Sequence, residues 1–240
     1  MSESGCLGAG EGLNERMYAC KRQALRRALA AEGLRRDRTF SVLDGGCGQG
    51  QLARFYQKEF PASSYVGLDI SERAITHLRQ SMSGAEWYVA NLSALQDSEV
   101  GARTFDVVQS FEVLHLLLDD EAWRQALAGL ADRMAANGVL LVTAALPDQT
   151  EERSTYLRYR SRAQWNDAFV SLGLRIAAQR AMYYWLPSGG PANKYFRYAL
   201  TRFESVPLYL VDRAALTLGV PRPSSVGLDS RTHLLTLRRA

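Results

Sequence analysis

Three glycines at alternate positions and two carboxylates have the types and spacing of a nucleoside-binding site. A short apolar run ends at Asp44, and Gly46, Gly48 and Gly50 follow it. Glycines in such a turn let a ligand approach the backbone where a side chain would collide with it. The second carboxylate, Asp69, ends another apolar run about 20 residues beyond the turn, the spacing at which an acid binds both hydroxyls of a ribose. The two features together predict a cofactor that contains a nucleoside.

Two kinds of cofactor fit this prediction. Residues 48–53 satisfy the loose G-x-G-x-x-G/A pattern of a dinucleotide site, so a nicotinamide-dependent oxidoreductase is one alternative. Asp44 argues against it, because a carboxylate close to the helix N-terminus repels a pyrophosphate. S-adenosylmethionine has a ribose, a sulfonium and an ammonium group but no phosphate, and the acid suits its cationic portion. A non-catalytic scaffold that keeps the cofactor fold is the other alternative.

Five motifs in a fixed order resemble those of the class I S-adenosylmethionine-dependent methyltransferases of small molecules. They are the glycine turn at 44–50 and the segments 66–71, 87–92, 105–115 and 137–142. The resemblance implies an α/β fold, with a doubly wound, mostly parallel seven-stranded sheet, helices on both faces and an antiparallel final strand. It also implies in-line transfer of a methyl group, with catalysis mainly by positioning, of the kind common in secondary metabolism.

The resemblance further implies which residues bind the cofactor. We expect Tyr18 to cover the methionine portion and Asp69 to bind the ribose. Asn91 stands where the family usually has an acid, and its amide oxygen is expected to accept the adenine amino proton. The full expected set is Tyr18, Asp44, Gly45, Gly46, Gly48, Gln49, Asp69, Ile70, Asn91, Leu92 and Ser110.

His115 is the candidate catalytic base, since it follows the expected fourth strand, next to the reaction centre. Many relatives carry their histidine one residue later, where this chain has Leu116. The alternative is a histidine at a helix start that bonds to the backbone. A base is needed only where the acceptor must lose a proton, so we expect it to matter for a phenol or an alcohol.

The acceptor pocket is expected to include Glu112 and an aromatic-rich insertion at residues 183–227. Loops of this length in compact domains usually have a function or a structure of their own. We expect a cap over the pocket, and the alternative is a hydrophobic helical pair that packs on the domain or on a second subunit. The expected pocket residues are Glu112, Tyr183, Tyr184, Trp185 and Tyr195. Such a pocket favours an apolar or aromatic acceptor, with oxygen as the first choice of methylated atom.

Composition excludes several other classes. The 240 residues suffice for one enzyme domain, and no apolar stretch approaches the roughly 20 residues that span a bilayer. The three cysteines lack metal-ligand spacing, which predicts free thiols, no metal and a cytoplasmic location. The net charge of +4 comes from scattered arginines, so no nucleic-acid partner is expected. The arginines at 158, 160 and 162 are interpreted as a solvated surface segment. A monomer or a homodimer is expected.

Hydrophobic periodicity predicts the elements that position these residues. Helices are expected at 12–33, 50–59, 72–81, 120–135 and 161–172, and strands at 40–44, 64–69, 86–90, 105–110, 139–145, 174–180 and 232–238, with a turn at 137–138. Ser71 is the expected N-cap of the third helix. We predict one methyltransferase domain over 1–240, divided into an N-terminal helical lid at 1–35, a cofactor-binding core at 36–182, the cap at 183–227 and the final strand at 228–240.

Overall fold

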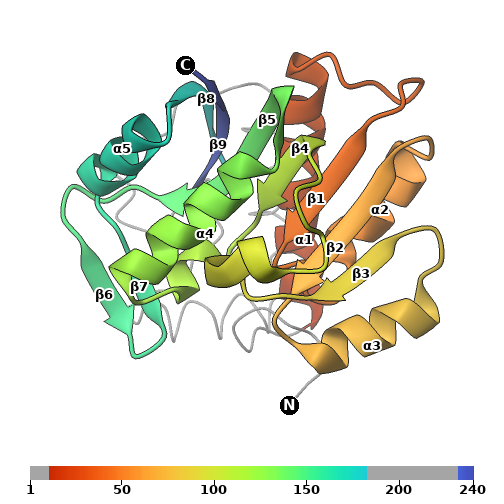
Figure 1. Cartoon of the computed structure of the whole chain (residues 1–240), viewed down its shortest axis with the longest axis horizontal. Coiled ribbons are helices and arrows are strands. Elements are labelled where there is room, and N and C mark those ends of the chain that lie inside the picture. The colour runs from red at the N-terminus through yellow and green to blue at the C-terminus, as the bar shows by residue number, and fades with distance from the viewer. Residues whose placement is uncertain (1–10, 183–231) are drawn as a thin grey trace.

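Helices and strands alternate along the chain, and seven of the strands form one central sheet (Figure 1). The structure, a computed structural model, describes residues 11–182 and 232–240. The strands of the sheet are β1 (Ser41–Gly45), β2 (Ser64–Asp69), β3 (Glu86–Val89), β4 (Phe105–Ser110), β5 (Met134–Ala145), β8 (Leu174–Ala181) and β9 (Thr232–Arg239). The α-helices are α1 (Glu11–Ala31), α2 (Gln51–Glu59), α3 (Glu72–Ser81), α4 (Asp120–Asp132) and α5 (Arg162–Ser171), and the short 3-10 helices are η1 (Leu92–Asp97) and η2 (Leu114–Leu116).

The strand order β3-β2-β1-β4-β5-β9-β8 confirms the predicted fold class. The first five strands in this order pair in parallel, whereas β9 is antiparallel to both β5 and β8. Strand order reverses at β1, which pairs with β2 on one side and with β4 on the other. Ligands of open parallel sheets bind at the carboxyl ends of the strands beside such a reversal. The loops after β1 and β4 therefore define where a site is expected.

Helices cover both faces of the sheet, so consecutive strand residues enter two different cores. Val42 and Val107 pack against α1, α2 and α3, whereas their neighbours Leu43 and Val108 pack against η1, α4 and α5. Burial of both faces explains why the strands read as continuous apolar runs instead of alternating patterns. Figure 1 shows α4 and η1 together on the face turned toward the viewer.

Side-chain caps fix where several helices begin. Ser71 accepts a hydrogen bond from the N–H of Ala74, which confirms the predicted N-cap of α3. Asp119 accepts one from the N–H of Ala122 at the start of α4, and Ser161 forms a capping box with Gln164 in α5. These oxygens satisfy N–H groups that have no partner within the helix.

The fifth strand begins earlier than its sequence predicts. We expected a helix to 135 and a turn at Asn137–Gly138, but α4 ends at Asp132 and β5 begins at Met134. The pairing register shifts between Phe105 and Val107, so the extra residues bulge within the strand. A Cβ at Gly138 would lie 2.8 Å from the Phe105 carbonyl oxygen. The glycine therefore permits an irregularity in a strand, where the sequence suggested a turn.

A hairpin that was not predicted follows β5. Strands β6 (Glu151–Ser154) and β7 (Leu157–Tyr159) pair antiparallel, apart from the main sheet. The interpretation of this region as a solvated arginine segment is wrong for Arg160, whose side chain is only 1% exposed, whereas Arg162 is exposed as expected. Desolvated guanidinium groups need fixed acceptors, and the contacts of Arg160 supply them, as described below.

Three findings concern membrane-spanning helices, metal ligands and cysteines. Among the described helices, none has the length and apolar character required to cross a membrane. No cluster of metal-ligating side chains occurs within residues 11–182 and 232–240. In the same part of the chain, Cys20 and Cys47 are buried and form no disulfide, in line with the cysteine spacing.

Candidate cofactor and acceptor site

The glycine turn leaves β1 with a backbone that only glycine adopts without strain at three positions, Gly46, Gly48 and Gly50. Gly46 has φ of +84°, and a Cβ there would lie 2.2 Å from Val113 Cγ2. Gly48 has φ of +53°, but a Cβ there would meet no atom of residues 11–182 or 232–240 within 4 Å. The turn is held against β2 because the N–H groups of Gly46 and Cys47 both donate to the Leu68 carbonyl. The backbone at Gly48 therefore borders open space at the carboxyl end of β1.

Asp69 lies beside this open space. Its Oδ2 accepts a hydrogen bond from the Gly48 N–H at 2.8 Å, and its Oδ1 accepts one from the Ser71 N–H at 2.9 Å. Each carboxylate oxygen has two lone pairs, so one acceptor position remains on each. Two fixed oxygens with spare lone pairs are the groups that adjacent ribose hydroxyls require.

Asp44 lies beneath the turn. Its side chain is buried, and its Oδ2 accepts a hydrogen bond from the Tyr65 hydroxyl. Burial raises the pKa of Asp44 to about 6, against the opposing effects of hydrogen bonds from Tyr65 and Gln109. Gln109 in turn accepts a hydrogen bond from the Tyr56 hydroxyl at 2.9 Å. The carboxylate is thus part of a buried polar network that supports the turn.

Three further expected cofactor residues lie at the base of the site. Ser110 is buried at the end of β4, and its hydroxyl donates to the Gly45 carbonyl at 2.9 Å. Leu92 belongs to the core under α4, and its methyl groups leave no room for a Cβ at Gly45. These contacts join the ends of β1 and β4 and keep the floor of the site close-packed.

The remaining expected cofactor residues in the core lie nearer the surface. Ile70 follows Asp69 and is 73% exposed, which is unusual for a large apolar side chain. Asn91 caps η1, where its Oδ1 accepts hydrogen bonds from the N–H and the hydroxyl of Ser93. With both lone pairs of that oxygen engaged, the amide NH₂ is the side-chain group of Asn91 best placed to meet a ligand. Gln49 is exposed within the turn.

A buried ion pair joins α1 to the loop after β4. Lys21 Nζ pairs with Glu112 Oε2 and lies 4.3 Å from the centre of the Tyr18 ring. Glu112 has φ of +58°, which is strained for a residue with a side chain, and its N–H donates to Thr143 Oγ1 at 2.6 Å. The structure therefore brings the expected Tyr18 and Glu112 to one place, with Lys21 between them.

His115 lies in η2, close to the same loop. Its ring meets Tyr159 of the hairpin edge-on, with ring centres 5.7 Å apart and planes at 87°. Burial lowers the pKa of His115, while Glu112 acts to raise it and Lys21 to lower it. The imidazole is therefore neutral at physiological pH, as a general base must be.

Known proteins resemble this chain in both sequence and fold. A family model described as a methyltransferase domain matches residues 43–140, the segment that contains the turn, Asp69 and His115. The match indicates a methyltransferase domain in this segment and agrees with the sequence motifs that lie within it. A fatty-acid O-methyltransferase of Mycolicibacterium smegmatis is 28% identical over 179 residues, which cover 74% of this chain but only 56% of that protein.

Two solved structures share the fold of this chain at low identity. An S-adenosylmethionine-dependent methyltransferase from Clostridium acetobutylicum is 10% identical, with a TM-score of 0.59 over 92% of this chain and 91% of that one. An O-methyltransferase from neocarzinostatin biosynthesis, solved with S-adenosylmethionine and 2-hydroxy-5-methyl naphthoic acid, is 15% identical. Its TM-score is 0.52 over 83% of this chain and 49% of that one.

Sequence reasoning missed two features of this structure. Lys21 is four residues from both Met17 and Leu25, so helical spacing places it on the buried face of α1. A cation within an apolar stripe is a signal that a partner carboxylate lies opposite. The second missed feature is the hairpin, although Leu157 and Tyr159 alternate with two arginines as in a strand.

Other expected residues lie outside the described part of the domain. These are the aromatic pocket residues Tyr183, Tyr184, Trp185 and Tyr195, together with the whole insertion at 183–227. The cap and the boundaries drawn for the lid, core and final strand therefore stay predictions.

Proposed function

We propose that this protein transfers a methyl group from S-adenosylmethionine to a small apolar or aromatic acceptor, at an oxygen atom. The observation that carries the proposal is the contact between the Gly48 N–H and Asp69 at the open end of β1. It sets a backbone without side-chain cover next to a carboxylate with free lone pairs, which fits a ribose and the chain that follows it.

Several residues of this chain fit the parts of the cofactor. Asp69 would accept from the ribose hydroxyls, and the exposed Ile70 would cover one face of the adenine. Asn91 would donate through its amide to a ring nitrogen of adenine, rather than accept as its sequence alone suggested. Tyr18 would cover the methionine portion. When bound, the cofactor supplies a methyl carbon that is electrophilic because it is attached to a sulfonium.

The acceptor is inferred from residues around η2 and from the relatives. His115 is held neutral by burial, so it would take the proton of a hydroxyl acceptor. The relative from Mycolicibacterium smegmatis is named as a fatty-acid O-methyltransferase, and one structural relative is an O-methyltransferase solved with an aromatic acid. Both names support transfer to oxygen on an apolar molecule.

The cofactor is tested by isothermal titration calorimetry with S-adenosylhomocysteine, and NADH serves as the competing ligand. The proposal expects binding of the first and none of the second. The reverse result would support an oxidoreductase and overturn the proposal.

Methyl transfer is tested by a screen with donor labelled in its methyl group, against phenols, fatty acids, alcohols and amines. Label in an ether or ester product supports transfer to oxygen. Label on an amine would correct the atom assigned here. Cofactor binding without any label transfer across the screen would favour the scaffold alternative.

A further inference from the structure

The β6–β7 hairpin has no part in the function proposed above, yet it lies against the candidate base. It follows the carboxyl end of β5, next to the loop after β4. Its Leu157 and Tyr159 form a small apolar cluster with Ala145 at the end of β5. The Tyr159 ring then meets His115 edge-on. One side of the imidazole is thus covered by a residue from the hairpin.

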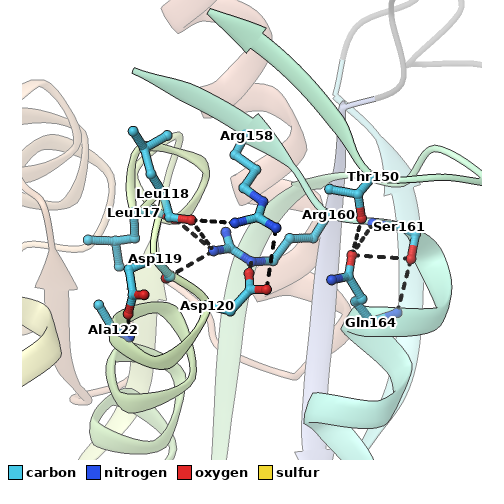
Figure 2. Close-up of polar contacts among 10 residues, drawn as sticks. All are labelled: Leu117, Leu118, Asp119, Asp120, Ala122, Thr150, Arg158, Arg160, Ser161 and Gln164. Atoms are coloured by element: carbon cyan, nitrogen blue, oxygen red, sulfur yellow. Dashed lines mark hydrogen bonds and ion pairs between the residues drawn. The ribbon is translucent and has the colours of Figure 1, made fainter. Parts of the chain in front are cut away.

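Arg160, the residue after Tyr159, contacts the segment that follows His115 in the sequence. Figure 2 shows the guanidinium of Arg160 directed at the backbone before α4. Its Nη2 lies 2.8, 3.3 and 3.0 Å from the carbonyl oxygens of residues 117, 118 and 119. Its Nε donates to Asp120 Oδ1 at 2.9 Å, and Arg158 approaches the other oxygen of Asp120. One buried side chain therefore contacts four consecutive residues.

The surroundings of Arg160 favour a single geometry. Its guanidinium carbon lies 4.4 Å from the centre of the Trp123 ring, so the group is held between an aromatic face and a carboxylate. Leu114, just before His115, is buried in the core. The segment that carries His115 is therefore anchored on one side by Leu114 and on the other by Arg160. Groups that must act on a substrate require this kind of support.

We propose that Arg160 is a positioning residue, which together with Tyr159 holds the η2 segment so that His115 faces the acceptor. This inference rests on the function proposed above, since it presupposes an acceptor at that place. Without Arg160, the Leu117 carbonyl loses its side-chain donor. The Leu118 and Asp119 carbonyls each lose one of two donors, since Arg158 and the Trp123 N–H remain, so the segment is held less firmly. The His115 ring would then lose its fixed position, although it never touches Arg160.

The titration of His115 reports its position without any turnover assay. The charged groups facing the ring are Glu112 from the loop after β4 and Lys21 from α1, and Tyr159 packs on it from β7. Burial is the main cause that lowers the pKa of His115. A segment released from the hairpin exposes the ring to water, so its titration midpoint moves up toward the ordinary value of about 6.5.

The experiment follows the three histidines of the chain by NMR after labelling with ¹⁵N-histidine, with His115→Gln used for assignment. We expect Arg160→Met to raise the midpoint of His115. The matched control is Arg133→Met, because Arg133 is also buried and donates to main-chain carbonyls, at Leu95 and Gly129. The control should lose stability without moving the His115 midpoint.

A second pair of variants keeps the test decisive if Arg160→Met does not fold. Tyr159→Leu removes the ring that covers His115 and should raise the midpoint, whereas Tyr159→Phe keeps the ring and should leave it unchanged. Unmoved midpoints in Arg160→Met and in Tyr159→Leu would each overturn the proposal. So would an upward shift of the same size in Arg133→Met.

Failure here is distinguishable from failure of the proposed function. If the wild type did not bind S-adenosylhomocysteine, the proposed function would be contradicted, but the titration of His115 would still test the role of Arg160. Where the wild type turns over a hydroxyl acceptor, Arg160→Met should lower kcat by about 10- to 100-fold, less than the roughly 100- to 10,000-fold that a general base contributes. The KM of the donor should stay unchanged. A rise in the donor KM instead would mean that Arg160 supports the cofactor site, contrary to the proposal.

Discussion

The backbone N–H of Gly48 donates to Asp69 Oδ2, so the turn after β1 and the acid that ends β2 form one unit. The second oxygen of Asp69 accepts from the Ser71 N–H at the start of α3. A single carboxylate therefore sets the positions of two loops at the carboxyl end of the sheet. This explains how two sequence features so far apart in the chain cooperate in one site.

Replacement of Asp69 should weaken cofactor binding. Both oxygens accept N–H groups, so Asp69→Asn must set an NH₂ against one of them, and Asp69→Ala removes both acceptors. We expect either change to reduce the binding free energy of S-adenosylhomocysteine by about 1–3 kcal/mol, measured by calorimetry.

Asp106→Asn is the matched control for this prediction. Asp106 also accepts a backbone N–H, from Ser41 at 2.8 Å, but at the opposite end of the strands. Asp106→Asn should bind S-adenosylhomocysteine with the affinity of the wild type. If Asp69→Asn and Asp69→Ala bound S-adenosylhomocysteine as tightly as the control and the wild type, the ribose assignment of Asp69 would be contradicted.

Gly48→Ala should separate the fold from the site. An alanine at this positive φ costs about 1–2 kcal/mol of folding free energy, but its methyl group meets no atom of the described residues within 4 Å. Gly33 has φ of +71° and equally open surroundings away from the site, so Gly33→Ala is the control for strain. Urea unfolding should show similar losses, whereas only Gly48→Ala should lose S-adenosylhomocysteine affinity, by at least about tenfold. A normal affinity in Gly48→Ala would mean that the ligand does not approach the turn there.

The stability of the protein should depend on pH through Asp44. The pKa of Asp44 is about 6 in the folded protein and 3.8 in its ordinary state, so folding takes up a proton between these values. Folding stability therefore falls as pH rises from about 4 to 6, by about 3 kcal/mol at 1.36 kcal/mol per pKa unit. Asp44→Asn cannot ionise and should lack this fall. Urea unfolding at several pH values should show the free energy of unfolding of the variant rising relative to that of the wild type up to pH 6. Parallel plots of this free energy against pH would refute the prediction.

The Lys21–Glu112 pair should show strong coupling. Glu112→Gln leaves the Lys21 ammonium buried without its carboxylate, which costs about 3–5 kcal/mol for a buried ion pair. Lys21→Met combined with Glu112→Gln removes both charges and should recover most of this loss. The four unfolding free energies form a double-mutant cycle, in which additive losses would show that the two side chains do not interact.

The rate of methyl transfer to a hydroxyl acceptor should rise with pH through the pKa of His115 and then level. Since that pKa lies below its ordinary value of about 6.5, the midpoint of the rise should also lie below that value. His115→Gln should lower kcat by about 100-fold or more and abolish the rise, while calorimetry shows unchanged S-adenosylhomocysteine affinity. An unaltered profile in the variant would assign the proton transfer elsewhere.

The sequence predicts the parts of this protein in which local pattern and burial agree. The strands that end at Asp44 and Asp69 are apolar throughout because both faces are covered, and the glycines between them mark a turn. Local pattern misled us at Gly138, because a glycine after an asparagine is typical of a turn and the bulge depends on contact with Phe105, a residue of another strand.

The acceptor side was harder to predict because its contacts are long-range. Arg160 reads as a surface cation until its carbonyl partners, some 40 positions earlier in the chain, are known. Lys21 and Glu112 are 91 positions apart. Neither distance is visible in a single sequence, although the place of Lys21 on an apolar stripe was a signal that went unused.

Strand β9 lies between β5 and β8, although its residues come later in the chain than those of both neighbours. During synthesis on a ribosome, β8 therefore cannot pair with β9 until residues 232–239 have left the exit tunnel. The first five strands can assemble during synthesis, but the antiparallel edge can close only once translation has passed that point. A nascent chain stalled before residue 232 should therefore expose the side of β5 that β9 covers and be a target for chaperones.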